Sequence, residues 1–266
     1  MFEAGTDWIS MQLVGFPVVA GIVLLAFVAN AKKSAHGKLN NPIRMASFAF
    51  SLALFGYTTW MFFEVFASID LDNGIIFNDY KLYDSYEWFP ALGIHWTVGL
   101  DALSFPMVWL TTFLLPVTII ATWHEKNGAT YFPTLLLMGG ALIGVFVSLD
   151  LFMFYVFWEL TLIPMFFLIL NWGGKDRKYA SQKFFIYTFT ASVVMLLGLV
   201  TLYLMQPDQI GTGGKYGTMT GRTFDIPTLV EAATNANMDG WYMGESMQKV
   251  LFVMLMLGFL VKLPAV

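Results

Sequence analysis

The sequence predicts an all-α fold class: a polytopic bundle of transmembrane helices with six complete spans, an incomplete seventh that a proline breaks, and an outside amino terminus. Hydrophobic residues make up 58% of the 266 residues and charged residues only 12%. A soluble globular protein has about 45–50% apolar and about 25% charged residues. The charges are also gathered in short clusters that separate long apolar runs. A bilayer is the solvent that tolerates this pattern, so we expect a multi-pass membrane protein.

The first six spans are predicted from nearly uncharged stretches that are long enough to cross the hydrocarbon core. The first runs from Trp8 to Ala31, and the acidic Glu3 and Asp7 before it fit a cleaved signal peptide poorly. The other five cover residues 45–69, 102–123, 131–149, 151–170 and 184–205.

The seventh span begins near Val250 and reaches the last residue, Val266. Pro264 lies within it, and proline removes a backbone donor and clashes with the preceding turn. This span is therefore expected to be broken and too short to be complete. A truncated reading frame, a contig edge or a split gene would each give such an ending, and we expect the isolated chain not to move protons.

The charges in the connections predict the orientation. Basic residues gather between the first and second spans and between the fifth and sixth, whereas the connection after the second span is acidic. The basic set is Lys32, Lys33, Lys38, Arg44, Lys175, Arg177, Lys178 and Lys183. The positive-inside rule places these connections in the cytoplasm. The net charge of −4 gives no basic surface for nucleic acid.

Two outside segments are not predicted as spans. Residues 87–100 alternate apolar and small residues around Pro90 and Gly93, which favours a short hairpin across the outer face. Residues 206–249 carry many Gly and Thr and are expected to form an irregular connection. We therefore divide the chain into a two-span region with its hairpin (1–101) and a longer membrane region (102–266).

Three further acids are expected to have structural roles or to be exposed to solvent. Asp101 precedes the third span, where a carboxylate at a helix N-terminus is favourable, and we expect it to cap that helix. Glu64 and Asp150 are expected to be solvated.

Glu159 lies eight residues into the fifth span, about 12 Å deep at about 1.5 Å per residue. An ionisable group at this depth costs roughly 2.5–3.5 kcal/mol, so it needs a reason. Either it is a protonated acid hydrogen-bonded between helices, or it is a proton-transfer group. The second interpretation is favoured for a lone acid in a membrane.

Lys262 is predicted to be the partner of Glu159, because it also lies near the midplane of its span. A broken helix that carries a lysine is a common way to build an ion site in a transporter. Lys183 opens the sixth span and has two open interpretations: it leads protons in from the cytoplasm, or it extends its charged end to the interface.

The chain has no cysteine and three histidines, none at the centre of an apolar run. Iron–sulfur ligation and a bis-histidine haem are therefore not expected, and we predict no cofactor and no metal in this chain.

Four segments resemble one family. They are Gly99-Leu-Asp-Ala-Leu-Ser-Phe-Pro, Phe157-Trp-Glu-Leu-Thr-Leu-Ile-Pro, Lys183-Phe-Phe-Ile-Tyr-Thr and Gly258-Phe-Leu-Val-Lys-Leu-Pro. Together they are similar to the antiporter-like subunits of respiratory complex I, and the second is similar to the subunit M type, called subunit 4 in mitochondria. The resemblance implies a proton channel in which Glu159 and Lys262 pass protons. Family members usually have about fourteen spans with two inverted five-helix repeats, so by this resemblance we expect the second repeat to be absent from these 266 residues.

The resemblance implies a membrane subunit of a proton-pumping NADH-quinone oxidoreductase, a non-redox part of a translocase. Its partners would be the other membrane subunits, which together with the rest of the complex bind the quinone and the electron donor. The alternative is a subunit of a multisubunit cation/proton antiporter or a membrane-bound hydrogenase of the same fold. A third class is a purely structural anchor. Without a transit peptide, the cell (cytoplasmic) membrane of a bacterium or archaeon is the simplest location.

Overall fold

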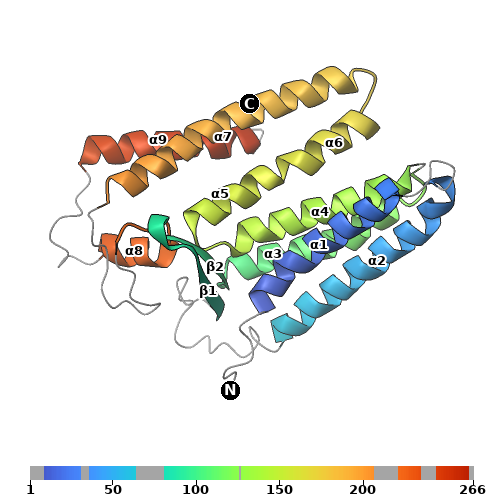
Figure 1. The fold of residues 1–266 in the computed structure, drawn as a ribbon, viewed down its shortest axis with the longest axis horizontal. Coiled ribbons are helices and arrows are strands. Elements are labelled where there is room, and N and C mark those ends of the chain that lie inside the picture. The colour runs from blue at the N-terminus through green and yellow to red at the C-terminus, as the bar shows by residue number, and fades with distance from the viewer. Residues whose placement is uncertain are drawn as a thin grey trace.

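The computed structural model describes residues 9–30, 36–63, 81–125, 127–206, 221–234 and 244–263, and helices dominate these ranges (Figure 1). The helices and strands are α1 (Ile9–Asn30), α2 (His36–Met61), β1 (Lys81–Phe89), β2 (Ile94–Leu100), α3 (Ser104–Ala121), α4 (Gly128–Val147), α5 (Leu151–Leu160), α6 (Leu162–Trp172), α7 (Arg177–Leu204), α8 (Ile226–Thr234) and α9 (Glu245–Lys262). The predicted helical fold class is confirmed.

Five helical segments in the described ranges are long and apolar enough to cross a membrane. They are Gln12–Asn30, Ser104–Ala121, Gly128–Val147, Leu151–Trp172 and Arg177–Leu204. The predicted second span, residues 45–69, corresponds to α2, which ends at Met61. Residues 64–69 of the predicted range lie outside the described residues. The predicted seventh corresponds to α9, which begins at Glu245, earlier than expected, and includes charged residues. The count of seven is therefore not confirmed.

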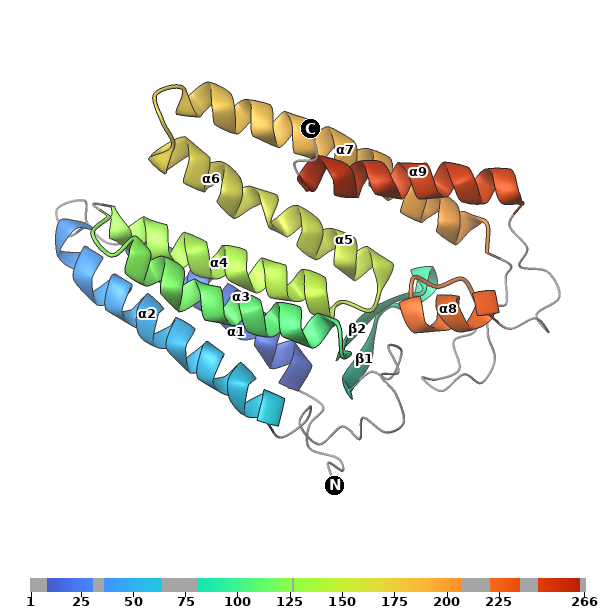
Figure 2. The same ribbon diagram turned by 180° about the vertical axis from the view of Figure 1, so that it is seen from behind.

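Alternate connections lie at opposite ends of the bundle. The α3–α4 and α6–α7 connections lie at one end, together with the facing ends of α1 and α2 (Figures 1 and 2). The hairpin and α8 lie at the other end, which we call the hairpin end (Figure 2). The first end carries Arg44, whose guanidinium donates to the Trp123 carbonyl just after α3, and Lys175 of the α6–α7 connection, as the positive-inside argument requires. The placement of that end in the cytoplasm stays a prediction.

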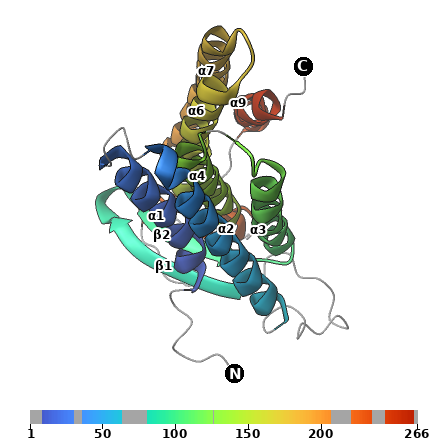
Figure 3. The same cartoon turned by 90° about the vertical axis from the view of Figure 1, so that its right-hand side faces the viewer.

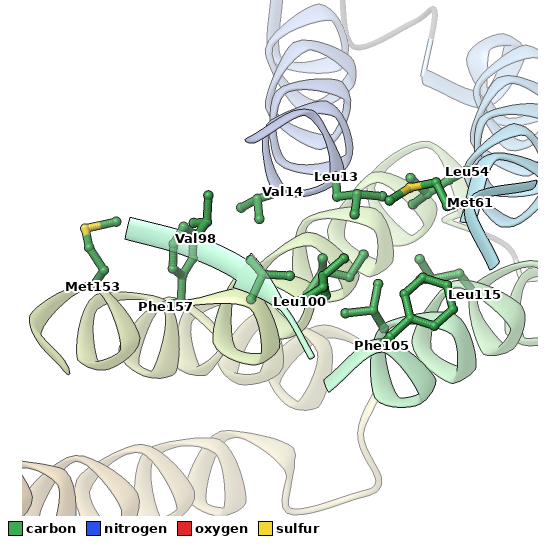
Figure 4. Close-up of a cluster of buried hydrophobic side chains, with 13 residues drawn as sticks. Leu13, Val14, Leu54, Met61, Val98, Leu100, Phe105, Leu115, Met153 and Phe157 are labelled. Carbon is green, nitrogen blue, oxygen red and sulfur yellow. The ribbon is translucent and has the colours of Figure 1, made fainter. Parts of the chain in front are cut away.

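The bundle is organised around α4. This helix packs against α1, α2, α3 and α5, while α7 and α9 form a pair further out (Figure 3). The main core includes Leu13 and Val14 of α1, Leu54 of α2 and Phe157 of α5, and it continues into strand β2 through Val98 and Leu100 (Figure 4). Since β2 contributes fully buried side chains, the hairpin is part of the core.

The predicted hairpin is present. Strand β1 pairs antiparallel with β2, with register shifts between Lys81 and Asp84 and between Glu87 and Phe89. Gly93 has a φ of +60° in the turn, and a Cβ there would lie 2.0 Å from the carbonyl oxygen of Arg222. Glycine is required here both by the left-handed conformation and by the close approach of the 222–224 segment.

The prediction of an irregular connection over residues 206–249 is wrong in part. Helix α8 lies within it, and α9 begins at Glu245. The segment before α8 is fixed by Gln206, whose side chain accepts from the backbone N–H of Thr223 at 2.8 Å and donates to its carbonyl at 2.9 Å. Nine residues are too short for the long apolar run used to predict spans, so α8 was not expected.

The expectation for Asp101 is confirmed, and that for Asp150 is wrong. The carboxylate of Asp101 accepts from the N–H groups of Leu103 and Ser104, and the Ser104 hydroxyl accepts from the Asp101 N–H in return. This is the reciprocal arrangement of a capping box. Asp150 is fully buried, because β2 and the 223–226 segment cover the start of α5. Glu64 lies outside the described residues.

Candidate functional site

The fifth predicted span is not one continuous helix. Helix α5 ends at Leu160, Thr161 forms a turn, and α6 begins at Leu162. Pro164 explains the break, because it has no N–H to donate to the carbonyl of Leu160 and its ring clashes with that carbonyl. Breaks of this kind leave backbone carbonyls available to other donors.

Glu159 lies in the last turn of α5, immediately before the break. Its Oε1 atom is buried and has no hydrogen-bond partner among the described residues. The groups that interact with its carboxylate are the Ser192 hydroxyl of α7, the Tyr155 hydroxyl one turn earlier, and the Lys262 ammonium. A carboxylate oxygen without a donor is costly to bury as an anion. This oxygen is therefore a place where a proton can be accommodated.

Lys262 reaches the same break from the last turn of α9. Its Nζ donates to the backbone carbonyl of Trp158 at 2.6 Å, and it also lies 3.9 Å from the centroid of the Trp158 ring. The Thr161 hydroxyl donates to the same carbonyl at 2.7 Å. The predicted pairing is thus found as an electrostatic interaction between Lys262 and Glu159, but the ammonium rests on the carbonyl of the preceding residue.

Close packing of α7 against α9 fixes the position of Lys262. A Cβ on Gly258 would lie 2.8 Å from the Cβ of Met195, so glycine lets the two helices approach. One residue further, the Phe259 ring packs edge-on against the Trp158 ring, with centroids 5.2 Å apart. These contacts hold α9 against α5 one turn before the lysine.

The site opens on a cavity of about 560 Å³, the volume of a small-molecule site. Its lining is mostly apolar, and the residues in it with polar side-chain groups are Thr161, Tyr187, Thr188 and Lys262. The full set is Met138, Leu142, Thr161, Leu162, Met165, Phe184, Tyr187, Thr188, Leu260, Val261 and Lys262. A cavity with few polar groups next to a lysine restricts water around that lysine.

Lys183 lies apart from Glu159. Its side chain is exposed on α7, with its Nζ 5.7 Å from the centroid of the Tyr179 ring. It lines a second hollow between α7 and α9, which shares Tyr187 and Val261 with the first. Both interpretations of Lys183, as a proton guide and as an interfacial anchor, stay predictions.

Sequence reasoning missed the groups that surround the predicted pair. Trp158, Thr161, Tyr155 and Ser192 are ordinary residues in apolar helices, and only Pro164 in the sequence signals a break near Glu159. Within the described residues, no group of three or more His, Cys, Asp or Glu side chains is placed to hold a metal ion.

The C-terminal part of the chain matches a known family. Residues 148–266 match the family described as NADH:quinone oxidoreductase/Mrp antiporter, transmembrane region. The predicted resemblance to this family is confirmed. Together with the helices described above, it makes the chain a multi-pass membrane protein.

Two curated relatives are similar over most of the chain. One is the F420H2 dehydrogenase subunit M of Methanosarcina mazei, 40% identical over 187 residues, which are 70% of this chain and 35% of that protein. Another is the NADH-quinone oxidoreductase subunit M of Rhodobacter capsulatus, 41% identical over 174 residues, or 65% of this chain and 32% of that protein. The chain thus spans about a third of the length of these relatives.

The fold is also found in a solved structure. Respiratory complex I from Thermus thermophilus with bound NADH contains a chain that matches 96% of this chain and 44% of its own length, with a TM-score of 0.69 and 22% identity. The match extends to the first half of the chain, which the family match does not cover.

Proposed function

Because residues 148–266 match the family of NADH:quinone oxidoreductase and Mrp antiporter membrane subunits, we propose that the chain is a membrane subunit of a proton-pumping NADH-quinone oxidoreductase of the complex I type. In this proposal it moves protons across the cytoplasmic membrane while other subunits transfer electrons to quinone. Those subunits bind the electron donor and the quinone, and this chain carries no cofactor. The absence of cysteine from the sequence supports the last point.

One observation carries the proposal: an acid and a lysine from two helices meet at a break in the fifth span. The Oε1 atom of Glu159 has no partner among the described residues, and Lys262 is held within the same turn by the Trp158 carbonyl. A structural acid would be expected to have both oxygens satisfied, because a buried polar group without a partner destabilises the fold.

The geometry supports a simple exchange. An ammonium held by a carbonyl and a ring can leave them for a nearby carboxylate without unfolding a helix, since only the lysine side chain moves. When Lys262 lies on the Trp158 carbonyl, a proton on Glu159 satisfies the buried oxygen. When the ammonium moves to Glu159, it replaces that proton, which is then free to leave. Ser192 lies beside Glu159 and can accept a hydrogen bond from the protonated acid.

The test is Glu159→Gln in the complete complex, in membrane vesicles. Glutamine keeps the size of the side chain and removes the proton-binding oxygen. We expect most of the proton uptake per NADH oxidised to be lost. Glu245→Gln is the matched control, because Glu245 is an exposed residue at the start of α9 that pairs with Lys249 at 2.6 Å. If Glu159→Gln pumps as well as the unchanged protein, with the chain present in the complex, the chain is only a structural anchor.

The second candidate is a subunit of a multisubunit cation/proton antiporter. The description of the matching family names Mrp antiporters beside the quinone oxidoreductases, which supports this alternative. The two functions differ in their driving force. A proton gradient that is built by NADH in the absence of Na⁺ supports the pump, whereas Na⁺ efflux that is driven by an imposed proton gradient without NADH supports the antiporter.

A further inference from the structure

Three elements meet at the hairpin end of the bundle, away from Glu159. The connection before α5 runs between β2 and the segment before α8. Leu149 donates its N–H to the carbonyl of Thr97 at 2.9 Å and accepts at its own carbonyl from Ile226 at 2.8 Å. Asp150 and Asp225 are bridge partners in this small antiparallel arrangement. Two acids are therefore brought together by backbone pairing.

The backbone around Asp150 stabilises its ionised carboxylate. Its side chain is fully buried, yet Oδ1 accepts from the N–H groups of Phe152 at 2.8 Å and Met153 at 3.1 Å, and Oδ2 accepts from the N–H of His95 at 3.2 Å. The carboxylate also caps the N-terminus of α5, where a negative charge is favourable. Both carboxylate oxygens of Asp150 therefore accept hydrogen bonds from backbone N–H groups.

Asp225 has hydrogen-bond donors for only one of its two carboxylate oxygens among the described residues. It is also fully buried, and its Oδ2 accepts from the Thr228 N–H at 2.9 Å and from the Thr228 hydroxyl at 2.6 Å. Its Oδ1 is buried and has no hydrogen-bond partner among the described residues. The Thr97 hydroxyl interacts with this carboxyl and lowers the pKa of Asp225, but its hydrogen-bond partner by distance is the Ser85 hydroxyl, at 2.9 Å. One oxygen of the pair is therefore left without a donor.

The charged groups around the pair include His95, whose electrostatic interaction with Asp225 lowers the pKa of that acid. Strand β2 contributes His95, whose Nδ1 faces the carbonyl of Gly93 at 3.2 Å. Arg222, on the segment before α8, donates to the carbonyl of Gln206 at 3.1 Å. Strand β1 adds two further acids, the buried Asp84 and the exposed Glu87. Two buried like charges in electrostatic contact disfavour double ionisation.

We propose that Asp150 and Asp225 form a proton-binding site that holds one proton, on Oδ1 of Asp225, and that this proton keeps α8 and the hairpin joined to the start of α5. Burial supports this, since it raises the pKa of Asp225 and raises the pKa of Asp150 to about 6. When the proton leaves as the pH rises, two buried anions face each other across the bridge, and the joint is weakened. The site is independent of the proposed pump and can be tested without measuring transport.

The first test is infrared difference spectroscopy of the purified protein, titrated from acid to alkaline pH in a Glu159→Gln background, which removes the acid of the proposed pump. We expect a band from a buried carboxylic acid that persists above the pH at which an exposed aspartic acid ionises. It should disappear in Asp225→Asn and remain in Asp176→Asn, a control that removes an exposed acid between α6 and α7. In Asp150→Asn the repulsion is gone, so the band should disappear at a lower pH.

The second test is amide hydrogen exchange at Thr228 and Leu229, corrected for the intrinsic effect of pH. In the unchanged protein, protection should fall as the solution becomes alkaline. In Asp225→Asn this fall should be absent, because asparagine imitates the protonated acid. A band and a protection profile that survive Asp225→Asn unchanged would overturn the proposal. A band lost in Asp150→Asn but kept in Asp225→Asn would overturn the placement of the proton.

Discussion

Gly258→Ala tests the claim that close packing of α7 and α9 positions Lys262. The added Cβ would lie 2.8 Å from the Cβ and 2.9 Å from the Sδ of Met195. Carbon atoms in contact prefer about 3.5–4.0 Å, so the helices must separate by about 1 Å. The sulfur can turn away, but a Cβ moves only with its backbone. Overpacking of this kind costs typically 1–3 kcal/mol of unfolding free energy.

The expected outcome is a lower denaturation temperature of the purified protein and a weakened contact of Lys262 with Trp158, read as a change in tryptophan fluorescence. Gly56→Ala is the control, because a Cβ on Gly56 meets nothing within 4 Å and alanine favours the helix. Adding Met195→Ala should not restore stability, since its Cβ remains. In a Met195→Gly background, Gly258→Ala should cost less than it does in the unchanged protein. If Gly258→Ala is as stable as Gly56→Ala, the packing argument is refuted.

Three further predictions concern the hairpin end and the end with the basic connections. The pKa of Asp150 is raised from 3.8 to about 6, so the folded state binds the proton of this acid more tightly than the unfolded state does. The free energy of unfolding should therefore fall by up to about 3 kcal/mol as the pH rises from about 4 to about 6. Denaturant titrations of Asp150→Asn should show a flatter dependence on pH. Gln206→Leu removes both hydrogen bonds to Thr223 and should cost about 2–4 kcal/mol, with faster exchange of the Thr223 amide as the measurement; unchanged exchange would contradict the role of Gln206. Arg44→Lys should lower the denaturation temperature because it loses the contact with the Trp123 ring, 4.6 Å from the guanidinium, whereas Arg177→Lys, at an exposed position, should not.

The sequence predicts what depends on solvent and on local chemistry. The helical class follows from the apolar runs, and the cap at Asp101 follows from its place before an apolar stretch. The approach of Lys262 to Glu159 was also predicted, since a charge in a membrane needs a partner.

The sequence does not show which contacts form between distant segments. Asp150 has the same local signature as Asp101, an acid before an apolar helix, but it is buried because β2 and the α8 segment cover it. The Trp158 carbonyl binds Lys262 because α5 ends two residues after Trp158 and α9 ends opposite this break. Tertiary placement, which no local pattern encodes, decided both cases.

The two hydrogen bonds between Gln206 and Thr223 have a practical consequence. At 2.8 and 2.9 Å, they fix the two ends of residues 207–220 beside each other. The entropic cost of closing a loop grows only slowly with its length, so the fold should tolerate a change in the number of residues between these ends. A short epitope placed there would report, in intact cells, which side of the membrane carries the hairpin end.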